Sequence, residues 1–323
     1  MSLSQMKVFN EYVMPATIET LSQMVDKFNA ASGGAIVLST EGFDGDFIQE
    51  SFFRSIHSAQ RRVDRYAALA SQSPTDLTQD VNVGVKVAGG FGPIRYEPSQ
   101  LTWLRKPTAE GVEVASRNFA EALMRDQLNT GIAASVAAIS NQASAKNDIT
   151  AGTNAVITYA AINDGHALFG DRSNDIVANV MTGSMYHKLI GQNLVNSTRL
   201  FQAQGVTVVD ILGKIVVVTD APALATTGTP GTDIVLGLTP NAVVVHDAGD
   251  VVSNISTDNG NTRIVTTMQV DYSFGVRLKG YKWDIANGGK SPTDAELATG
   301  SNWDLAATDI KNTAGVVIIG DKS

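Results

Sequence analysis

The chain has 323 residues, a formal net charge of −8 and no cysteine. The negative charge argues against a free duplex-binding surface, because neutralising phosphates requires clustered lysine and arginine. The lack of cysteine excludes disulfides, thiol nucleophiles and thiolate metal sites, and it is typical of a cytosolic protein. The length predicts two or more lobes, and a hydrophobic content of 43% indicates a folded chain.

Residues 1–34 are expected to form an N-terminal arm. Four apolar residues recur there at helical spacing before Gly33 and Gly34: Ile18, Leu21, Val25 and Phe28. This apolar face needs a partner, and two alternatives are open: packing on its own domain or lying on a neighbouring subunit. The first residues lack a signal-peptide pattern, and no apolar stretch is long enough to span a bilayer.

Two short elements are predicted next. Ile36–Leu38 is expected to be a strand. A turn at Asp44–Asp46 is expected to cap a helix that turns four residues inward: Ile48, Phe52, Phe53 and Ile56. The acids Glu41, Asp44 and Asp46 are better explained by cap and turn chemistry than by a metal. Beyond this helix lies a basic cluster of Arg61, Arg62 and Arg65. Two interpretations are open: the cluster is a solvated face, or it forms ion pairs with acids of a second copy.

A β-hairpin is predicted within residues 66–106. Alternating valines indicate one strand, and a glycine run at 89–92 is expected to turn the chain into return strands at 94–96 and 101–104. A lone two-stranded ribbon is marginal in water, so we expect it to lie on a second subunit. Deletion of residues 75–98 should then leave a folded protomer that assembles poorly. The candidate subunit-interface residues are Arg61, Arg62, Arg65, Val81, Val83, Val85, Lys86, Val87, Phe91, Ile94 and Tyr96.

A long helix is predicted from Thr108 to Asn141. Apolar residues recur in steps of three and four, and acids occupy its first turn, where the helix dipole favours them. Such a helix would be roughly 50 Å long, well beyond the usual length. Its second half is rich in alanine, which lets neighbouring backbone approach closely, and Gly131 allows a bend.

The remainder is expected to form a β-rich α/β lobe followed by long strands. Helices are predicted at 159–168, capped by Thr158, and around Met185–Ile190. Strands are predicted at 176–181, 206–211, 215–218, 234–238 and 242–246. After a turn signal at 258–261, further strands are predicted at 262–270, 272–278 and 281–285. Thr293 and Glu296 match a capping box, and Gly315–Gly320 is expected to add an edge strand.

No catalytic constellation emerges from the sequence. Neither Asp164 with His166 nor His246 with Asp247 is accompanied by a motif that supplies a nucleophile. The glycine run lacks the Lys-Ser/Thr ending of a phosphate loop, and no dinucleotide fingerprint or zinc spacing occurs. We therefore predict neither an enzyme nor a cofactor.

The order of the parts resembles the major capsid proteins of tailed bacteriophages. Four segments carry the resemblance: VNVGVKVAGGFGPIRY, the helix from Thr108, SNDIVANVMTGSMYHKLIGQN with GKIVVVTDAP, and RIVTTMQVDYSFGVRLKGYKWDI. It implies an α+β fold of the Hong Kong phage type. The implied parts are an N-terminal arm and helix (1–59), an extended β-hairpin loop (60–106), the spine helix of a peripheral domain (107–150), an axial domain (151–257), and the returning peripheral strands with the C-terminal segment (258–323).

The resemblance implies self-assembly through hexamers and pentamers into an icosahedral shell around packaged double-stranded DNA. Without a long acidic coiled-coil segment before residue 30, a separate scaffolding protein is expected, together with a portal; a decoration protein is left open. Some relatives cross-link a lysine of the extended loop, but nothing identifies a partner for Lys86, so we predict no cross-link. An encapsulin-like nanocompartment and an unrecognised α/β enzyme are the alternatives. The predicted location is the capsid of a virion assembled in the host cytoplasm.

Overall fold

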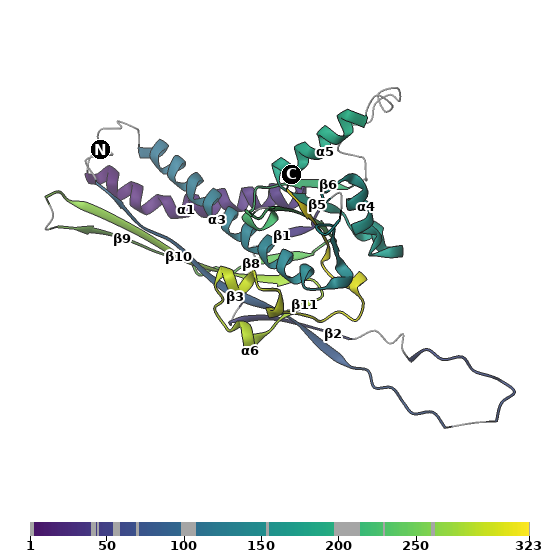
Figure 1. The fold of residues 1–323 in the computed structure, drawn as a ribbon. Helices are drawn as coiled ribbons and strands as arrows, with labels where there is room; N and C mark the ends of the chain where they lie inside the picture. Colours follow the sequence, from purple (N-terminus) through teal and green to yellow (C-terminus); the bar gives the residue numbers. More distant parts are fainter. Residues whose placement is uncertain are drawn as a thin grey trace.

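The structure is a computed structural model that describes residues 3–39, 43, 45–53, 59–68, 71–97, 108–152, 155–196, 214–228, 230–259 and 262–322. Two mixed β-sheets are joined by a long helix, and a thin ribbon projects from one end (Figure 1). The architecture is therefore α+β. None of the described helices is long and apolar enough to cross a membrane.

The first sheet has the strand order β1-β8-β10-β3-β2, with β9 also paired to β10. Its strands are β1 (Ile36–Ser39), β2 (Phe47–Phe53), β3 (Gln79–Tyr96), β8 (Val243–Asp247), β9 (Val252–Asp258) and β10 (Val265–Leu278). β8 and β9 follow one another along the same edge of β10, both antiparallel to it. The first sheet thus draws its strands from both halves of the chain.

The second sheet has the order β4-β13-β7-β5-β6. Its strands are β4 (Lys146–Asp148), β5 (Ala178–Met181), β6 (Ile215–Val218), β7 (Thr232–Leu238) and β13 (Gly315–Asp321). Two expectations are corrected here. β13 is an inner strand between β4 and β7 instead of an edge strand, and β8 leaves the lobe of β7 to join the first sheet.

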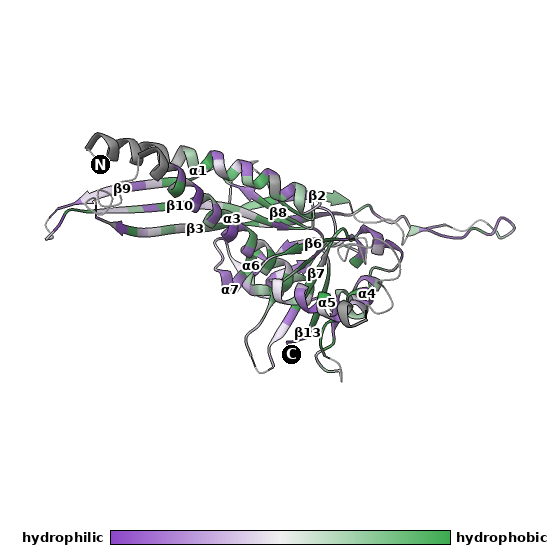
Figure 2. Cartoon of the chain, turned by 90° about the horizontal axis from the view of Figure 1, so that it is seen from above, coloured by the Kyte–Doolittle hydropathy of each residue, from purple (hydrophilic) through white to green (hydrophobic). Residues whose placement is uncertain are grey.

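Helices cover the two sheets. α1 (Leu3–Ala31) and α3 (Thr108–Ser140) lie together over the first sheet, whereas α4 (Tyr159–Ala167) and α5 (Gly183–Asn196) belong to the second (Figure 1). Figure 2 shows that hydrophobic residues gather where helices and sheets meet. The remaining short elements are η2 (Ala143–Ala145), η3 (Gly170–Asp175), η5 (Pro222–Leu224), β11 (Tyr281–Trp283), α6 (Ile285–Gly288), α7 (Asp294–Leu297), η6 (Gly300–Asn302), β12 (Trp303–Leu305) and η7 (Ile310–Asn312).

The predicted long helix is confirmed almost to the residue. Its alanine-rich half is buried, with Ala134 and Ala138 fully inaccessible. A Cβ at Gly131 would stand 3.1 Å from Val243 and 3.3 Å from Val245, so glycine lets β8 approach the helix closely. The small residues therefore serve packing between α3 and the first sheet.

The arm helix is also confirmed, and it is longer than expected. Leu21 and Val25 are buried in the protein's own core, with Phe28 packed against it, while Ile18 is 56% exposed. From Leu21 to Phe28, α1 therefore packs on its own domain and not on a neighbouring subunit. Its remaining side chains before Ala16 lie outside the described part of the chain.

The predicted hairpin at 81–104 is wrong, because β3 runs straight through the glycine run. Residues 85–96 of β3 pair with β10, with a register shift between Met268 and Val270. A Cβ at Gly89 would lie 2.8 Å from the ring of Tyr272, and one at Gly92, where φ is +104°, would meet the backbone of β10. These glycines permit close approach between strands instead of a reversal. The predicted return strand at 101–104 lies outside the described residues.

A projecting ribbon does exist, but its strands are β2 and the first half of β3. They pair antiparallel from Phe47 opposite Val85 to Phe53 opposite Gln79. The helix predicted after Asp46 is therefore wrong, since residues 47–53 form a strand; Ile56 lies outside the described residues. Pairing with β3 overrides the helical spacing of the aromatic residues.

The later predictions are largely confirmed. The strands predicted on either side of Asp271 form the single strand β10, which begins at Val265. Of the turn signal at 258–261, Asp258 is the last residue of β9, and residues 260–261 lie outside the described part of the chain. Thr158 caps α4, and Thr293 with Glu296 forms the capping box of α7. The strand predicted at 206–211 lies outside the described residues.

Candidate subunit interface

The described residues at the end of the ribbon, 59–68 and 71–78, form a segment that we call the tip. All of them are exposed, including Arg61, Arg62 and Arg65. Three large apolar side chains are exposed as well: Val63 by 68%, Tyr66 by 99% and Leu77 by 60%. The tip projects beyond the paired ends of β2 and β3, away from the body of the molecule (Figure 1). Within the described residues its arginines form no ion pair, so this apolar and cationic surface lacks cover from its own chain.

The alternating valines have a different place from the one expected. Val83, Val85 and Val87 are buried in the core of their own protomer, and Val81 is half-buried against it. They are not available to a second subunit, because they are buried in their own protomer, where β3 lies between β2 and β10 and contacts β11. The ribbon is thus anchored by its valines, whereas its far end and most of β2, including Phe53, are exposed.

Lys86 is engaged within its own chain. Its ammonium group lies 3.0 Å from Asp250 Oδ2 and 5.7 Å from the centre of the Phe43 ring. The backbone N–H and hydroxyl of Ser273 also donate to Asp250. Burial raises the pKa of Asp250, but the hydrogen bonds from Ser273 and Lys86 outweigh it and leave that pKa lowered. Asp250 therefore ties β3, β10 and the link between β8 and β9 together.

The remaining candidate interface residues on β3 are Phe91, Ile94 and Tyr96, of which Phe91 packs in the core and Ile94 lies at the surface. The Phe91 ring lies 5.3 Å from Tyr272 and 6.4 Å from Phe119, and this aromatic cluster fastens β3 to α3. Ile94 is 44% exposed. The backbone of Tyr96 pairs with Thr266, and its side chain lies outside the described part. Ile94 and the tip arginines are thus the candidates available to a second copy.

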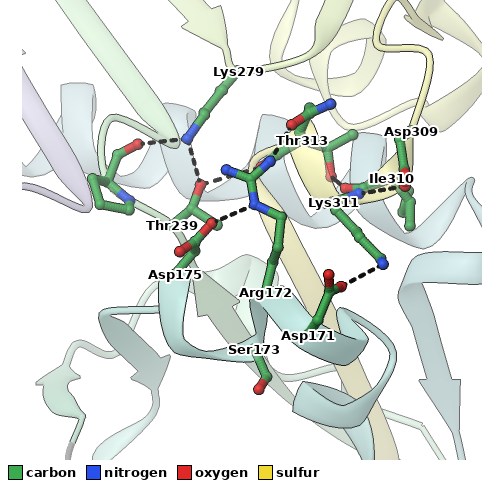
Figure 3. A network of polar contacts seen from close by, with 12 residues as sticks. Asp171, Arg172, Ser173, Asp175, Thr239, Lys279, Asp309, Ile310, Lys311 and Thr313 are labelled. Carbon is green, nitrogen blue, oxygen red and sulfur yellow. Dashed lines mark hydrogen bonds and ion pairs between the residues drawn. The ribbon is translucent and has the colours of Figure 1, made fainter. Parts of the chain in front are cut away.

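A polar network that the sequence did not reveal joins the two sheets. Figure 3 shows Arg172 between Asp175 and the segment after Asp309. Arg172 Nε donates to Asp175 at 2.7 Å, and its terminal nitrogen donates to Asn312. Nearby, Lys279 donates to Thr239 and Pro240, each at 3.2 Å. Burial lowers the pKa of Lys279, and Arg172 lowers it further. The contact between Arg172 and Asn312 joins η3 to η7 across 140 positions of the sequence, and the contact between Lys279 and Thr239 joins the end of β10 to the end of β7.

The histidines do not form a catalytic site among the described residues. His166 is buried and its Nε2 lies 2.9 Å from Asn179 Oδ1, whereas Asp164 is exposed and does not bond to it. His246 packs edge-on against Phe43, and His187 is exposed beside Tyr186. His57 lies outside the described part of the chain. No group of acids and histidines that could hold a metal occurs in the described residues.

One open hollow of about 940 Å³ lies between α1, α3 and the chain after β6. Its floor is apolar, with Met24, Phe28, Met124 and Leu128 among the residues that line it. Glu121 and Arg125 of α3 line it together with Thr219 and Asp220, and none of the described lining residues is a histidine, serine or lysine. The hollow therefore offers contact area and no acid–base pair with a nucleophile.

The buried His166 makes a pH-dependent contribution to stability. Burial lowers its pKa, the bond to Asn179 raises it in part, and Lys214 lowers it further. As pH falls below about 6.5, the unfolded chain takes up a proton that the folded chain resists, so the free energy of unfolding falls by at most about 1.4 kcal/mol per pH unit. Urea unfolding at pH 7.5 and 5.5 should show this slope. His166→Gln should reduce it, and exposed His187→Gln should keep it; an equal slope in all three proteins would contradict the assignment.

The comparisons with known structures identify the fold. The chain is similar to the capsid protein of Cyanophage Pam1, with a TM-score of 0.51, 14% identity and coverage of 88% of either chain. It is also similar to the capsid of Ralstonia phage GP4, with a TM-score of 0.50, 8% identity, and coverage of 91% of this chain and 89% of the other. No curated protein matches the chain in sequence.

These likenesses show the fold, which is the Hong Kong phage-type capsid fold. The family model described as "Major capsid protein 13-like" matches residues 5–317. The chain therefore belongs to the Gp13-like family of major capsid proteins. It is a structural component of the virion capsid, and it is not an enzyme.

Proposed function

We propose that copies of this chain form hexamers and pentamers that close into an icosahedral shell around packaged double-stranded DNA. The observation that carries the proposal is the exposed tip, whose apolar and arginine side chains have no cover within the described residues of their own protomer. A contact between the tip and a different surface of the next copy is heterologous, and such contacts form a ring when the rotation from one copy to the next closes. Each contact is modest in area, but repetition around a closed ring makes the sum cooperative.

The parts of the fold take the following roles in this proposal. The extended loop comprises β2, the tip and the first half of β3. The peripheral domain is the first sheet with α1 and α3, and α3 is its spine helix. The axial domain is the second sheet with α4 and α5, whose loops would meet their symmetry copies at the centre of a capsomer. A separate scaffolding protein and a portal complete the proposed assembly.

Electron microscopy of the purified full-length protein in negative stain tests the proposal. We expect rings or closed shells. Small particles of constant size at every protein and salt concentration would contradict it. Particles purified from infected cells should protect double-stranded DNA from nuclease. Shells that contain a protein cargo and no protected DNA would instead indicate a nanocompartment.

The tip arginines should contribute to assembly without contributing to folding. Replacing Arg61, Arg62 and Arg65 together by glutamine removes three proposed ion pairs with the neighbouring copy. An exposed ion pair contributes about 0.5 kcal/mol, so the concentration needed for assembly should rise roughly tenfold. The assembly threshold, measured by light scattering at two salt concentrations, should also become less dependent on salt. Arg117→Gln is the control, because that exposed arginine pairs with Glu121 of its own helix. An unchanged threshold in the triple variant would remove the arginines from the interface.

A further inference from the structure

Strand β9 is an uncovered edge of the first sheet. Its seven residues pair with β10, from Val252 opposite Asp271 to Asp258 opposite Val265, and in the described part of the chain they pair with no other strand. Every residue of β9 is exposed except Ile255, which is half-buried. The outer N–H and C=O groups of β9 are therefore free to pair with another extended segment.

This edge lacks the features that usually prevent pairing between sheets. Natural edge strands are often short, or carry lysine, proline or a bulge. β4, at one edge of the second sheet, is three residues long and has Lys146 and Asp148 among them. β9 has the sequence VSNISTD, in which the only charged residue is Asp258 at its end. Apart from Asp258 its side chains are short and neutral, so a second strand can lie alongside most of its length without repulsion.

The position of β9 fits a second kind of contact between copies. The hairpin of β9 and β10 and the tip lie at opposite ends of the molecule (Figures 1 and 2). A heterologous contact through the tip closes a ring, but it does not join one ring to the next. A closed shell needs another contact, and a two-fold contact at the opposite end of the protomer would supply it.

We propose that β9 of one copy pairs antiparallel with β9 of a second copy around a two-fold axis through Ile255. This register uses all seven residues, because Ile255 is the midpoint of the strand. It places Ile255 opposite its own mate, Asn254 opposite Ser256 and Val252 opposite Asp258. No like charges face each other, and like charges directly opposite are what destabilises such pairs. The proposal rests on the self-assembly proposed above and adds the partner of this edge.

The chain has no cysteine, so a cysteine introduced into β9 can form a disulfide only with another introduced cysteine. In the proposed register the two Ile255 Cα atoms are about 4.5–5.5 Å apart, within the range that a disulfide can bridge. The two Val252 Cα atoms would be about 20 Å apart, because six strand residues separate them. Ile255→Cys should therefore give covalent dimers on oxidation of assembled particles, analysed on non-reducing gels. Val252→Cys should give none, and Val252→Cys with Asp258→Cys should give dimers again.

A charge test checks the same register without a disulfide. Asn254→Lys with Ser256→Lys places lysines opposite each other twice and should shift the protein from shells to separate rings. Asn254→Lys with Ser256→Glu places opposite charges together and should keep the shells. Both pairs of substitutions lie on exposed positions facing Gln269 and Thr267 of β10, so circular dichroism should show an unchanged fold.

Equal cross-linking of Ile255→Cys and Val252→Cys, or no dimer of Ile255→Cys in shells, would overturn the β9 contact while leaving the proposed shell intact. Cross-links from β9 to a different protein of the particle would likewise overturn self-pairing. A wild-type chain that never assembles would contradict both proposals.

Discussion

Replacing residues 54–78 with an Asn-Gly turn is expected to give a folded protomer that no longer forms shells. Phe53 and Gln79 are the last paired residues of β2 and β3, so a two-residue turn can join them directly. The tip makes no contribution to the core, since its described residues are all exposed. The thermal unfolding midpoint should therefore change little, whereas the tip contact between copies is lost.

Two measurements made side by side decide this prediction: circular dichroism melting for the fold, and sedimentation velocity with electron microscopy for assembly. Removal of residues 75–98 is the contrasting deletion. It takes away β3, whose Val85 is inaccessible and whose partners are β2 and β10, so we now expect it to unfold the protomer. Normal shells from the turn replacement would show that the tip is not needed for assembly.

Val85→Asp should abolish the folded state. Val85 is fully inaccessible and stands in the middle of the first sheet, opposite Val276 on β10 and Phe47 on β2. A carboxylate there would be buried without a partner, which costs more than about 4 kcal/mol, close to the whole stability of many proteins. The same change at the exposed Val63 should leave stability within about 0.5 kcal/mol of wild type.

Urea titration followed by far-ultraviolet circular dichroism measures both variants. Val85→Ala, which removes apolar volume without adding charge, should still fold with a loss of about 2 kcal/mol. An unfolding midpoint of Val85→Asp close to that of the wild type would mean that the valines of β3 do not form the core. Val63→Asp should instead weaken assembly, because Val63 belongs to the tip.

Local signals were sufficient for elements whose pattern is complete within a run of neighbouring residues. The helix from Thr108 could be predicted because more than thirty residues keep one apolar face and contain no proline. The caps at Thr158 and Thr293 follow from side chains that bond within three residues. The strand character of residues 81–87 followed from alternation, and alternation reports burial on one face of a sheet.

Long-range partners account for the errors. Gly89 and Gly92 resemble a turn in sequence, and only the closeness of Tyr272 and β10 explains why glycine is needed there. The valine alternation likewise could not tell whether the covering surface belonged to the same chain or to another. β7 and β8 are separated by four residues yet lie in different sheets, which no local pattern encodes.

The candidate interface was only partly accessible to sequence reasoning. Arg61, Arg62 and Arg65 were identified as a cluster, and the fold places them on the exposed tip. Val83, Val85 and Val87 were chosen with them, although they anchor the ribbon in the protomer. The network around Arg172 joins segments distant in sequence, and the unguarded edge of β9 becomes visible only when its single partner strand is known.

A cryo-electron microscopy map of assembled particles tests the central claim most directly, by tracing residues 59–78 in the shell. We expect Val63, Tyr66 and the tip arginines to lie against a neighbouring copy within the same ring. A map in which this segment folds back on its own protomer, or points into solvent with no neighbouring chain beside it, would contradict the account.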